Sequence, residues 1–163
     1  MANITPFDPI TYMQQLHGEL KITTEKYRFA KVSGVGALEE ILENSRRDKY
    51  FFAVDDSQDG TTFRGAGAGY FERRPYTVFI LGKADYGDME AREAVLSEAK
   101  TIYRHLLSRL IRDKLNIPVL DMERIRFYEV PPAFASGCSG LYFIFNVQIP
   151  VNLVYDTKAW GDK

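Results

Sequence analysis

The 163-residue chain is poor in the residues that usually carry reactive chemistry, with one cysteine and two histidines. A single cysteine excludes an internal disulfide, and two histidines leave little scope for a histidine metal site. Lys and Arg number 21 against 22 Asp and Glu, so a formal net charge of −1 provides no bulk field toward nucleic acid or an anionic membrane. We therefore expect no membrane partner, and nucleic acid is an improbable one.

The sequence also lacks targeting and membrane signals. No apolar run approaches the ~20 residues of a membrane span. The start, Met1 to Pro6, has neither the basic nor the apolar region of a signal peptide. Together with the single cysteine, these absences predict a protein that folds in the reducing cytoplasm.

What is present is an ordinary globular composition, 45% hydrophobic and 26% charged. The length and the absence of linkers predict one domain over residues 1–156, followed by a polar tail over 157–163. Apolar residues at helical spacing predict a helix that starts at Asp8-Pro9, another after Ser33, and a long amphipathic one over about 88–113.

Runs of strand-forming residues lie between and after these helices, at 27–32, 50–54, 76–81, 125–130 and 141–155. The order of elements predicts an α+β fold: a mixed or antiparallel sheet of four to five strands, with helices mainly on one face and one long amphipathic helix. A regular βαβ alternation is absent, which argues against a doubly wound nucleotide-binding fold.

Two motifs resemble ligand-binding loops but lack necessary parts. The segment from Asp55 to Gly60 begins like a calcium loop, yet position twelve is Ala66 instead of the required carboxylate. The segment 65–69, Gly-Ala-Gly-Ala-Gly, is followed by residues 70–75, which cannot start a helix, so it is neither a dinucleotide nor a P-loop motif. We interpret the first as a turn and the second as a flexible arm or the bent rim of a hairpin.

Nucleophilic catalysis receives no support from the sequence. Cys138 has small, uncharged neighbours, and only His17 and His105 could act as its base. Ser139 lacks the nucleophile-elbow spacing, since Leu141 stands where the second glycine belongs. We therefore predict no catalytic residue, no metal site and no cofactor.

The acidic residues Asp85, Asp88 and Glu90 precede the long helix, where carboxylates ordinarily complement the helix dipole. Their nearness to strand and helix ends leaves one enzymatic alternative open. This is a small-ligand enzyme or binding domain with a pocket near Asp85, Asp88, Cys138 and Ser139.

The glycine-rich stretch is flanked by aromatic and arginine residues, the types enriched at protein–protein hot spots. These residues are our predicted interface: Phe63, Arg64, Tyr70, Phe71, Arg73 and Arg74. The same mixture could stack single-stranded nucleic acid, so a nucleic-acid-binding module is a second alternative. The near-neutral charge and the lack of a wider basic stripe argue against it. A plain surface loop with scattered aromatics is as compatible with the segment as an interaction arm.

Three segments carry a resemblance to a known family. They are the buried strand Tyr76-Thr77-Val78-Phe79-Ile80-Leu81, the long helix with Ala91-Arg92-Glu93-Ala94-Val95 and Ile102-Tyr103-Arg104-His105-Leu106-Leu107, and the closing strand Phe145-Asn146-Val147-Gln148-Ile149-Pro150-Val151. Their order is similar to that of the small α/β proteins of tailed-phage tail termination and head–tail joining, over roughly residues 1–156.

The resemblance implies a non-enzymatic structural subunit that forms a ring, usually of six copies, and becomes part of the virion. Its partners would be copies of itself and tail-tube or head-connector proteins, and a loop projecting from the sheet would fall at 56–75. Independently, Pro150 cannot donate to a ladder, so the closing strand is an edge or bends there. That edge and the aromatic–arginine segment would provide two different surfaces, as a closed ring requires.

Overall fold

The computed structural model describes residues 7–56, 59–131 and 137–161. The elements follow in this order: α1 (Pro9–Glu19), α2 (Lys21–Lys26), β1 (Arg28–Val32), α3 (Gly34–Asn44), β2 (Tyr50–Asp55), β3 (Thr61–Arg64), β4 (Tyr70–Lys83), α4 (Met89–Asp113), β5 (Leu120–Glu129), β6 (Cys138–Val151) and α5 (Thr157–Trp160).

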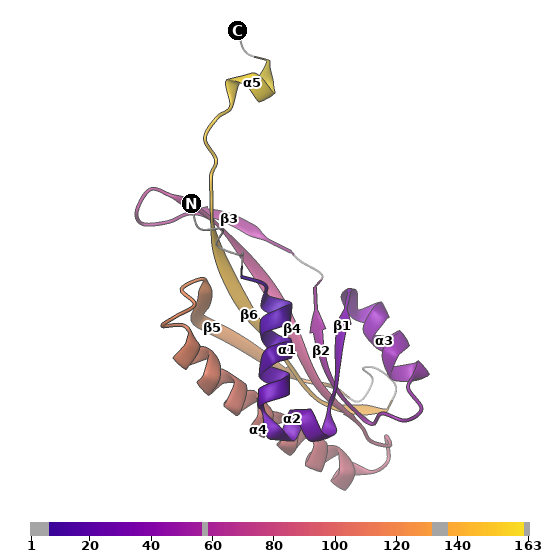
Figure 1. Ribbon diagram of the computed structural model, residues 1–163. Coiled ribbons are helices and arrows are strands. Elements are labelled where there is room, and N and C mark those ends of the chain that lie inside the picture. Colours follow the sequence, from indigo (N-terminus) through magenta and orange to yellow (C-terminus); the bar gives the residue numbers. More distant parts are fainter. Residues whose placement is uncertain (1–6, 57–58, 132–136, 162–163) are drawn as a thin grey trace.

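All six strands belong to one sheet of order β1-β2-β4-β6-β5, with β3 paired to β4 beyond the end of β2 (Figure 1). Only the β1–β2 pair is parallel, so the sheet is mixed and the predicted α+β class is confirmed. The sheet has one strand more than the four to five predicted. The extra strand is β3, whose four residues are mostly exposed and show no apolar alternation that sequence analysis could detect.

Helices α1, α2 and α4 cover one face of the sheet, as Figure 1 shows. The main core lies there, where Met13, Leu16, Ile102 and Leu106 pack against the strands. Helix α3 lies on the opposite face and presses Leu38 and Leu42 onto residues of β2 and β4. Because side chains alternate between the faces of a strand, β2 is buried on both sides where α3 covers it.

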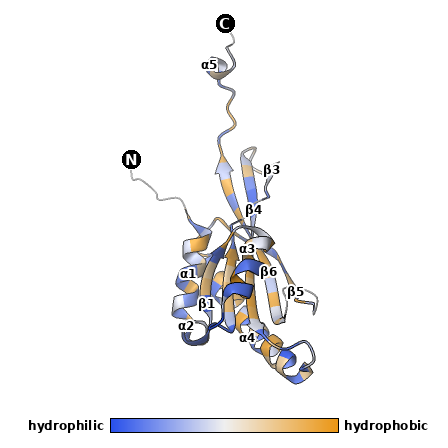
Figure 2. Cartoon of the chain, turned by 90° about the vertical axis from the view of Figure 1, so that its right-hand side faces the viewer, coloured by the Kyte–Doolittle hydropathy of each residue, from blue (hydrophilic) through white to orange (hydrophobic). Residues whose placement is uncertain are grey.

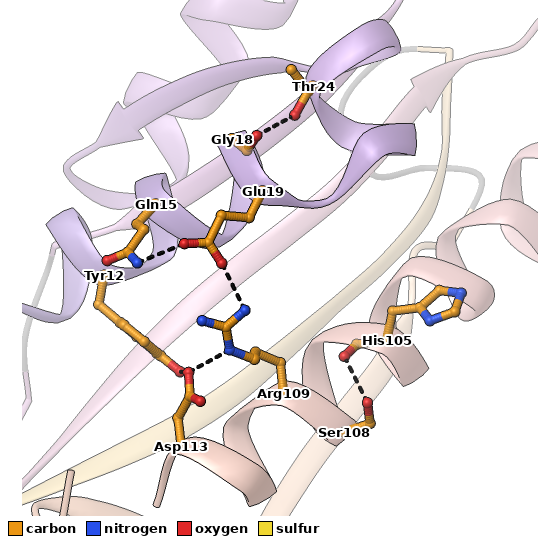
Figure 3. Close-up of polar contacts among 9 residues, drawn as sticks. All are labelled: Tyr12, Gln15, Gly18, Glu19, Thr24, His105, Ser108, Arg109 and Asp113. Carbon is orange, nitrogen blue, oxygen red and sulfur yellow. Dashed lines mark hydrogen bonds and ion pairs between the residues drawn. The ribbon is translucent and has the colours of Figure 1, made fainter. Parts of the chain in front are cut away.

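Polar contacts anchor α1 on α4 (Figure 3). Tyr12 donates its hydroxyl to Asp113 Oδ2 over 2.9 Å, and Arg109 Nε donates to the same oxygen over 2.6 Å. Arg109 also reaches back to α1, where its Nη1 lies 2.6 Å from Glu19 Oε2. The side chain of Asp113 is only 13% exposed. Its two donors therefore replace the hydrogen bonds with water that this carboxylate loses on burial.

The helix starts are capped by carboxylates. Asp8 accepts from the backbone N–H groups of the first turn of α1, as predicted. Helix α3 begins after Ser33, as predicted, and Ser33 is its N-cap residue, but the side chain of Ser33 donates to Asp56 and makes no cap bond. Instead Asp55 Oδ1, from the end of β2, accepts from Gly34 N–H over 2.9 Å.

The strands β4 and β6 form the longest pair, running from Tyr70↔Val151 to Lys83↔Cys138. Strand β4 starts six residues before the predicted 76, and β6 starts earlier and ends earlier than the predicted 141–155. Opposite Pro150, β6 has β4 as a partner on one side only, since the β5 pairing stops at Val147. The predicted edge at Pro150 is therefore confirmed.

Candidate interaction surface

The upper ends of β4 and β6 rise beyond the helices together with β3, as Figures 1 and 2 show. We call this three-stranded projection the β-tongue; it consists of β3, residues 70–74 of β4 and residues 147–151 of β6. All six predicted interface residues lie on it. Its β3 and β4 residues fall within the segment 56–75, where the resemblance placed a projecting loop.

The glycine-rich stretch is the loop that closes the β-tongue. Gly65 N–H donates to the carbonyl of Gly69 over 2.8 Å, and Ala68 N–H donates to the carbonyl of Gly65 over 3.2 Å. Ala68 takes the left-handed conformation with φ of 66°. Of the two interpretations of this stretch, the bent rim of a hairpin is therefore the one confirmed.

One face of the β-tongue, on the α3 side of the sheet, carries an aromatic–arginine stack. Phe63 and Phe71 are cross-strand partners whose rings stack at 5.8 Å between centroids. The guanidinium carbon of Arg73 lies 5.4 Å from the centroid of Phe63, within cation–π range. Arg73 Nε also lies 2.9 Å from Oδ2 of Asp121, which is 5% exposed.

This stack borders an open hollow of about 750 Å³ on the sheet face that α3 leaves uncovered. The lining side chains are nearly all polar or charged: Thr61, Arg73, Asp121, Glu123, Arg124, Arg126, Ile144 and Asn146. Gln148 Nε2 donates to Asp121 over 2.8 Å, so Asp121 of β5 contacts two strands of the β-tongue, β4 through Arg73 and β6 through Gln148. Both signs of charge line the hollow, which suits a surface with its own mixture of charges better than an anion.

The opposite face of the β-tongue presents the other three predicted residues. Arg64 pairs with Tyr70 in the register, and Arg74 lies on the same side because strand side chains alternate. Tyr70 is 43% exposed. Arg74 donates to Glu72 Oε2 over 2.6 Å, and this bond raises the pKa of Arg74 above its ordinary value. The six residues thus form two surfaces, where sequence analysis grouped them as one.

Sequence analysis missed the partners supplied by β5 and β6, which are Asp121, Arg124, Arg126, Asn146 and Gln148. Asn146 and Gln148 carried a signal, because they are the polar alternates of an otherwise apolar strand. Asp121 had none, since its pairing with Arg73 joins elements far apart in the chain.

Structural roles occupy most of the groups behind the small-ligand alternative. Cys138 is fully buried, and burial raises the pKa of its thiol. Ser139 donates its hydroxyl to the carbonyl of Arg92 over 2.8 Å, and Asp88 caps α4 by accepting from Ala91 N–H. The hollow described above lies elsewhere, so this alternative gains no geometric support.

The remaining motifs also resolve into local contacts. In the calcium-like segment, Asp55 caps α3 and Asp56 pairs with Lys31 at 2.9 Å, while residues 57–58 lie outside the described ranges. His17 Nε2 lies 2.7 Å from the carbonyl of Tyr27, and His105 is exposed on α4. Within the described part of the chain, no three or more His, Cys, Asp or Glu side chains gather closely enough to hold a metal ion.

For the nucleic-acid alternative, the ion pairs of the β-tongue matter most. Arg73 and Arg74 both face carboxylates, which reduces the positive potential available to a phosphate backbone. The alternative therefore stays a prediction with no added support. Across residues 7–56, 59–131 and 137–161, no helix is long and apolar enough to cross a membrane.

Comparison with known proteins adds no identification, because no family model and no curated protein matches the chain. The function must therefore be argued from the geometry together with the pattern of the sequence.

Proposed function

We propose that the chain is a non-enzymatic structural subunit of a phage or prophage particle, which forms a ring at the tail end or the head–tail junction. The observation that carries the proposal is the β-tongue. This three-stranded extension presents aromatic and arginine side chains on both faces, and within it only Val147 and Ile149 of β6 join or pack on the main core. Such residues in such a place suit binding to another protein.

The sheet supports the ring part of the proposal. Its outer strands are β1 at one end and β5 at the other, and neither has a second strand partner among the described residues. The edge of β1, the edge of β5 and the β-tongue are therefore three different surfaces of one copy. Contacts between unlike surfaces of identical copies close into a ring when the rotation between copies permits.

The test is negative-stain imaging of the concentrated protein, alone and mixed with purified phage tail tubes. We expect ring-shaped particles and rings bound at tube ends. A double variant with Arg64→Ser and Tyr70→Ser removes two exposed side chains of the β-tongue and should reduce tube capping by about tenfold or more. Arg104→Ser, an exposed arginine on α4, is the matched control and should cap tubes normally.

A chain that remains monomeric at high concentration and binds neither tubes nor connector proteins would contradict the proposal. So would normal capping by the β-tongue variant at unchanged thermal stability. Tighter binding to single-stranded nucleic acid, weakening steeply with salt, would favour that alternative instead.

A further inference from the structure

The chain beyond β6 forms an extended arm, residues 152–161, that runs away from the body and ends in α5 (Figures 1 and 2). Every residue of this arm is exposed. Leu153 is 57% exposed, Val154 80% and Trp160 72%. Scattered exposed apolar residues are common, but several large ones together on a segment that leaves the domain mark a binding element.

The first part of the arm has the sequence of a strand, but the pairing of β6 with β4 ends before it, at Val151. Apolar alternation continues past Val151 through Leu153, which is why the sequence predicted a strand to 155. Pairing stops at Val151 because its partner strand β4 begins at Tyr70. The backbone of 152–154 therefore has no strand beside it among the described residues, although Leu153 and Val154 are residues that favour one.

The outer edge of β5 offers the complementary feature. This ten-residue strand ends the sheet, so one of its sides is unpaired within the described residues. Phe127 is 49% exposed, and its ring contacts that of Tyr103. The next residue, Tyr128, is 41% exposed, and its ring stacks on Tyr142 on the opposite face of the sheet. A strand added along this edge would pair the backbone and cover both rings.

The other outer edge is shorter, since strand β1 has five residues against the ten of β5. Both edges carry ion-paired side chains, so charge does not distinguish them. The greater length of β5 and its two exposed rings favour it as the acceptor.

We propose that residues 152–161 dock in trans on the outer edge of β5 of a second copy of this chain. In the structure the arm leads away from its own β5, so the donor segment and the acceptor edge of one copy lie apart. Each copy then gives one arm and receives another, a head-to-tail contact that can close into a ring. The inference rests on the self-association in the proposed function, and it supplies the surfaces that associate.

Trp160 is the single tryptophan of the chain, so its fluorescence reports on the arm alone. A trace of the native chain is titrated with an excess of the Trp160→Phe chain, which emits no tryptophan signal. We expect the emission of Trp160 to move to shorter wavelength as the acceptor concentration rises, since docking removes the indole from water. A double variant of the tracer, Leu153→Ser with Val154→Ser, should weaken the association by about tenfold or more. Lys158→Ser, at an exposed polar position of the same arm, should leave it unchanged.

The acceptor edge is tested by placing Tyr128→Lys in the Trp160→Phe chain, which should abolish the shift. Glu39→Lys, an exposed charge change on α3, serves as its control and should leave the shift unchanged. The arm variants lie outside the folded body, so they test the proposal even if the β5 variant fails to fold. Emission that stays at long wavelength up to the solubility limit would overturn the proposal, and so would short-wavelength emission that is independent of concentration, which means docking on the arm's own domain.

The two proposals fail separately. Rings that cap tail tubes without any change in Trp160 emission would overturn arm exchange and leave the assembly function standing. A concentration-dependent shift in a protein that binds no tube or connector would support arm exchange and contradict the proposed assembly function.

Discussion

Replacing Gly140 by alanine tests the central strand pair that supports the β-tongue. Gly140 lies in β6 opposite Leu81 of β4, with a φ of 133° that L side chains rarely adopt. A methyl group at this position would lie 2.1 Å from the carbonyl oxygen of Ile80 and 3.1 Å from the Cα of Leu81. Both contacts are with backbone, so the two strands would have to separate locally by more than 1 Å to restore ordinary contact.

We expect Gly140→Ala to reduce the free energy of unfolding by about 2–6 kcal/mol. The unfavourable φ contributes about 1–3 kcal/mol, and overpacking against a paired backbone contributes a similar amount. A domain of this size has about 5–15 kcal/mol in total, and each kcal/mol lowers the melting temperature by about 2–4 °C. Urea and thermal unfolding, followed by circular dichroism, measure the change.

Two other glycines serve as controls for the same substitution. Gly18 is in α1 with open space around its Cβ position, so Gly18→Ala should be neutral or stabilise by up to about 1 kcal/mol. At Gly69, in the β-tongue loop, the nearest atom to the added methyl would be a ring carbon of Phe71 at 3.8 Å, an ordinary contact. A loss below about 1 kcal/mol for Gly140→Ala would refute the reasoning, because the pair would then tolerate separation.

The remaining predictions concern side chains. Arg109→Met removes the cation from the largely buried Asp113 and should lower the free energy of unfolding by about 1.5–3 kcal/mol in urea titrations. The hydrogen bond from Ser33 holds the pKa of Asp56 below its ordinary value, so this carboxylate stabilises the fold at neutral pH and loses that contribution as the pH falls below about 4. Asp56→Asn should therefore show a smaller loss of stability between about pH 5 and pH 3. The buried thiol of Cys138, with its raised pKa, should react with a thiol reagent only as the protein unfolds.

Each of these has a control and a contrary result. Arg112→Met, at an exposed position of the same helix, should change stability little, and an equal loss would mean that the ion pair is not responsible. Identical pH profiles for the native chain and Asp56→Asn would remove the carboxylate from the explanation. Labelling of Cys138 at the same rate in native and unfolded protein would show that the sheet end is open.

Local patterns predicted the secondary structure where a residue's own neighbours decide it. The stripe of α4 and the alternation of β6 each expose a polar set and bury an apolar one, so a different conformation or register would place the apolar set in water. Asp8 and Asp88 cap helices that begin beside them, which needs no partner from elsewhere in the chain. The six predicted interface residues lie on one projecting hairpin, because a turn joins their two strands, and their role in an interface stays a prediction.

The tertiary structure decided what depends on residues distant in the sequence. β6 ends at Val151 and releases the arm because β4 begins at Tyr70, and no local signal in either segment marks that limit. Strand alternation divided the predicted interface between two faces, while the pairing of Arg73 with Asp121 joined the β-tongue to β5 across the sheet. A sequence determines local conformation through side chains that are adjacent in the chain. Sheet edges and surface hollows depend instead on the order of the strands, because that order determines which strands lie at the outside of the sheet.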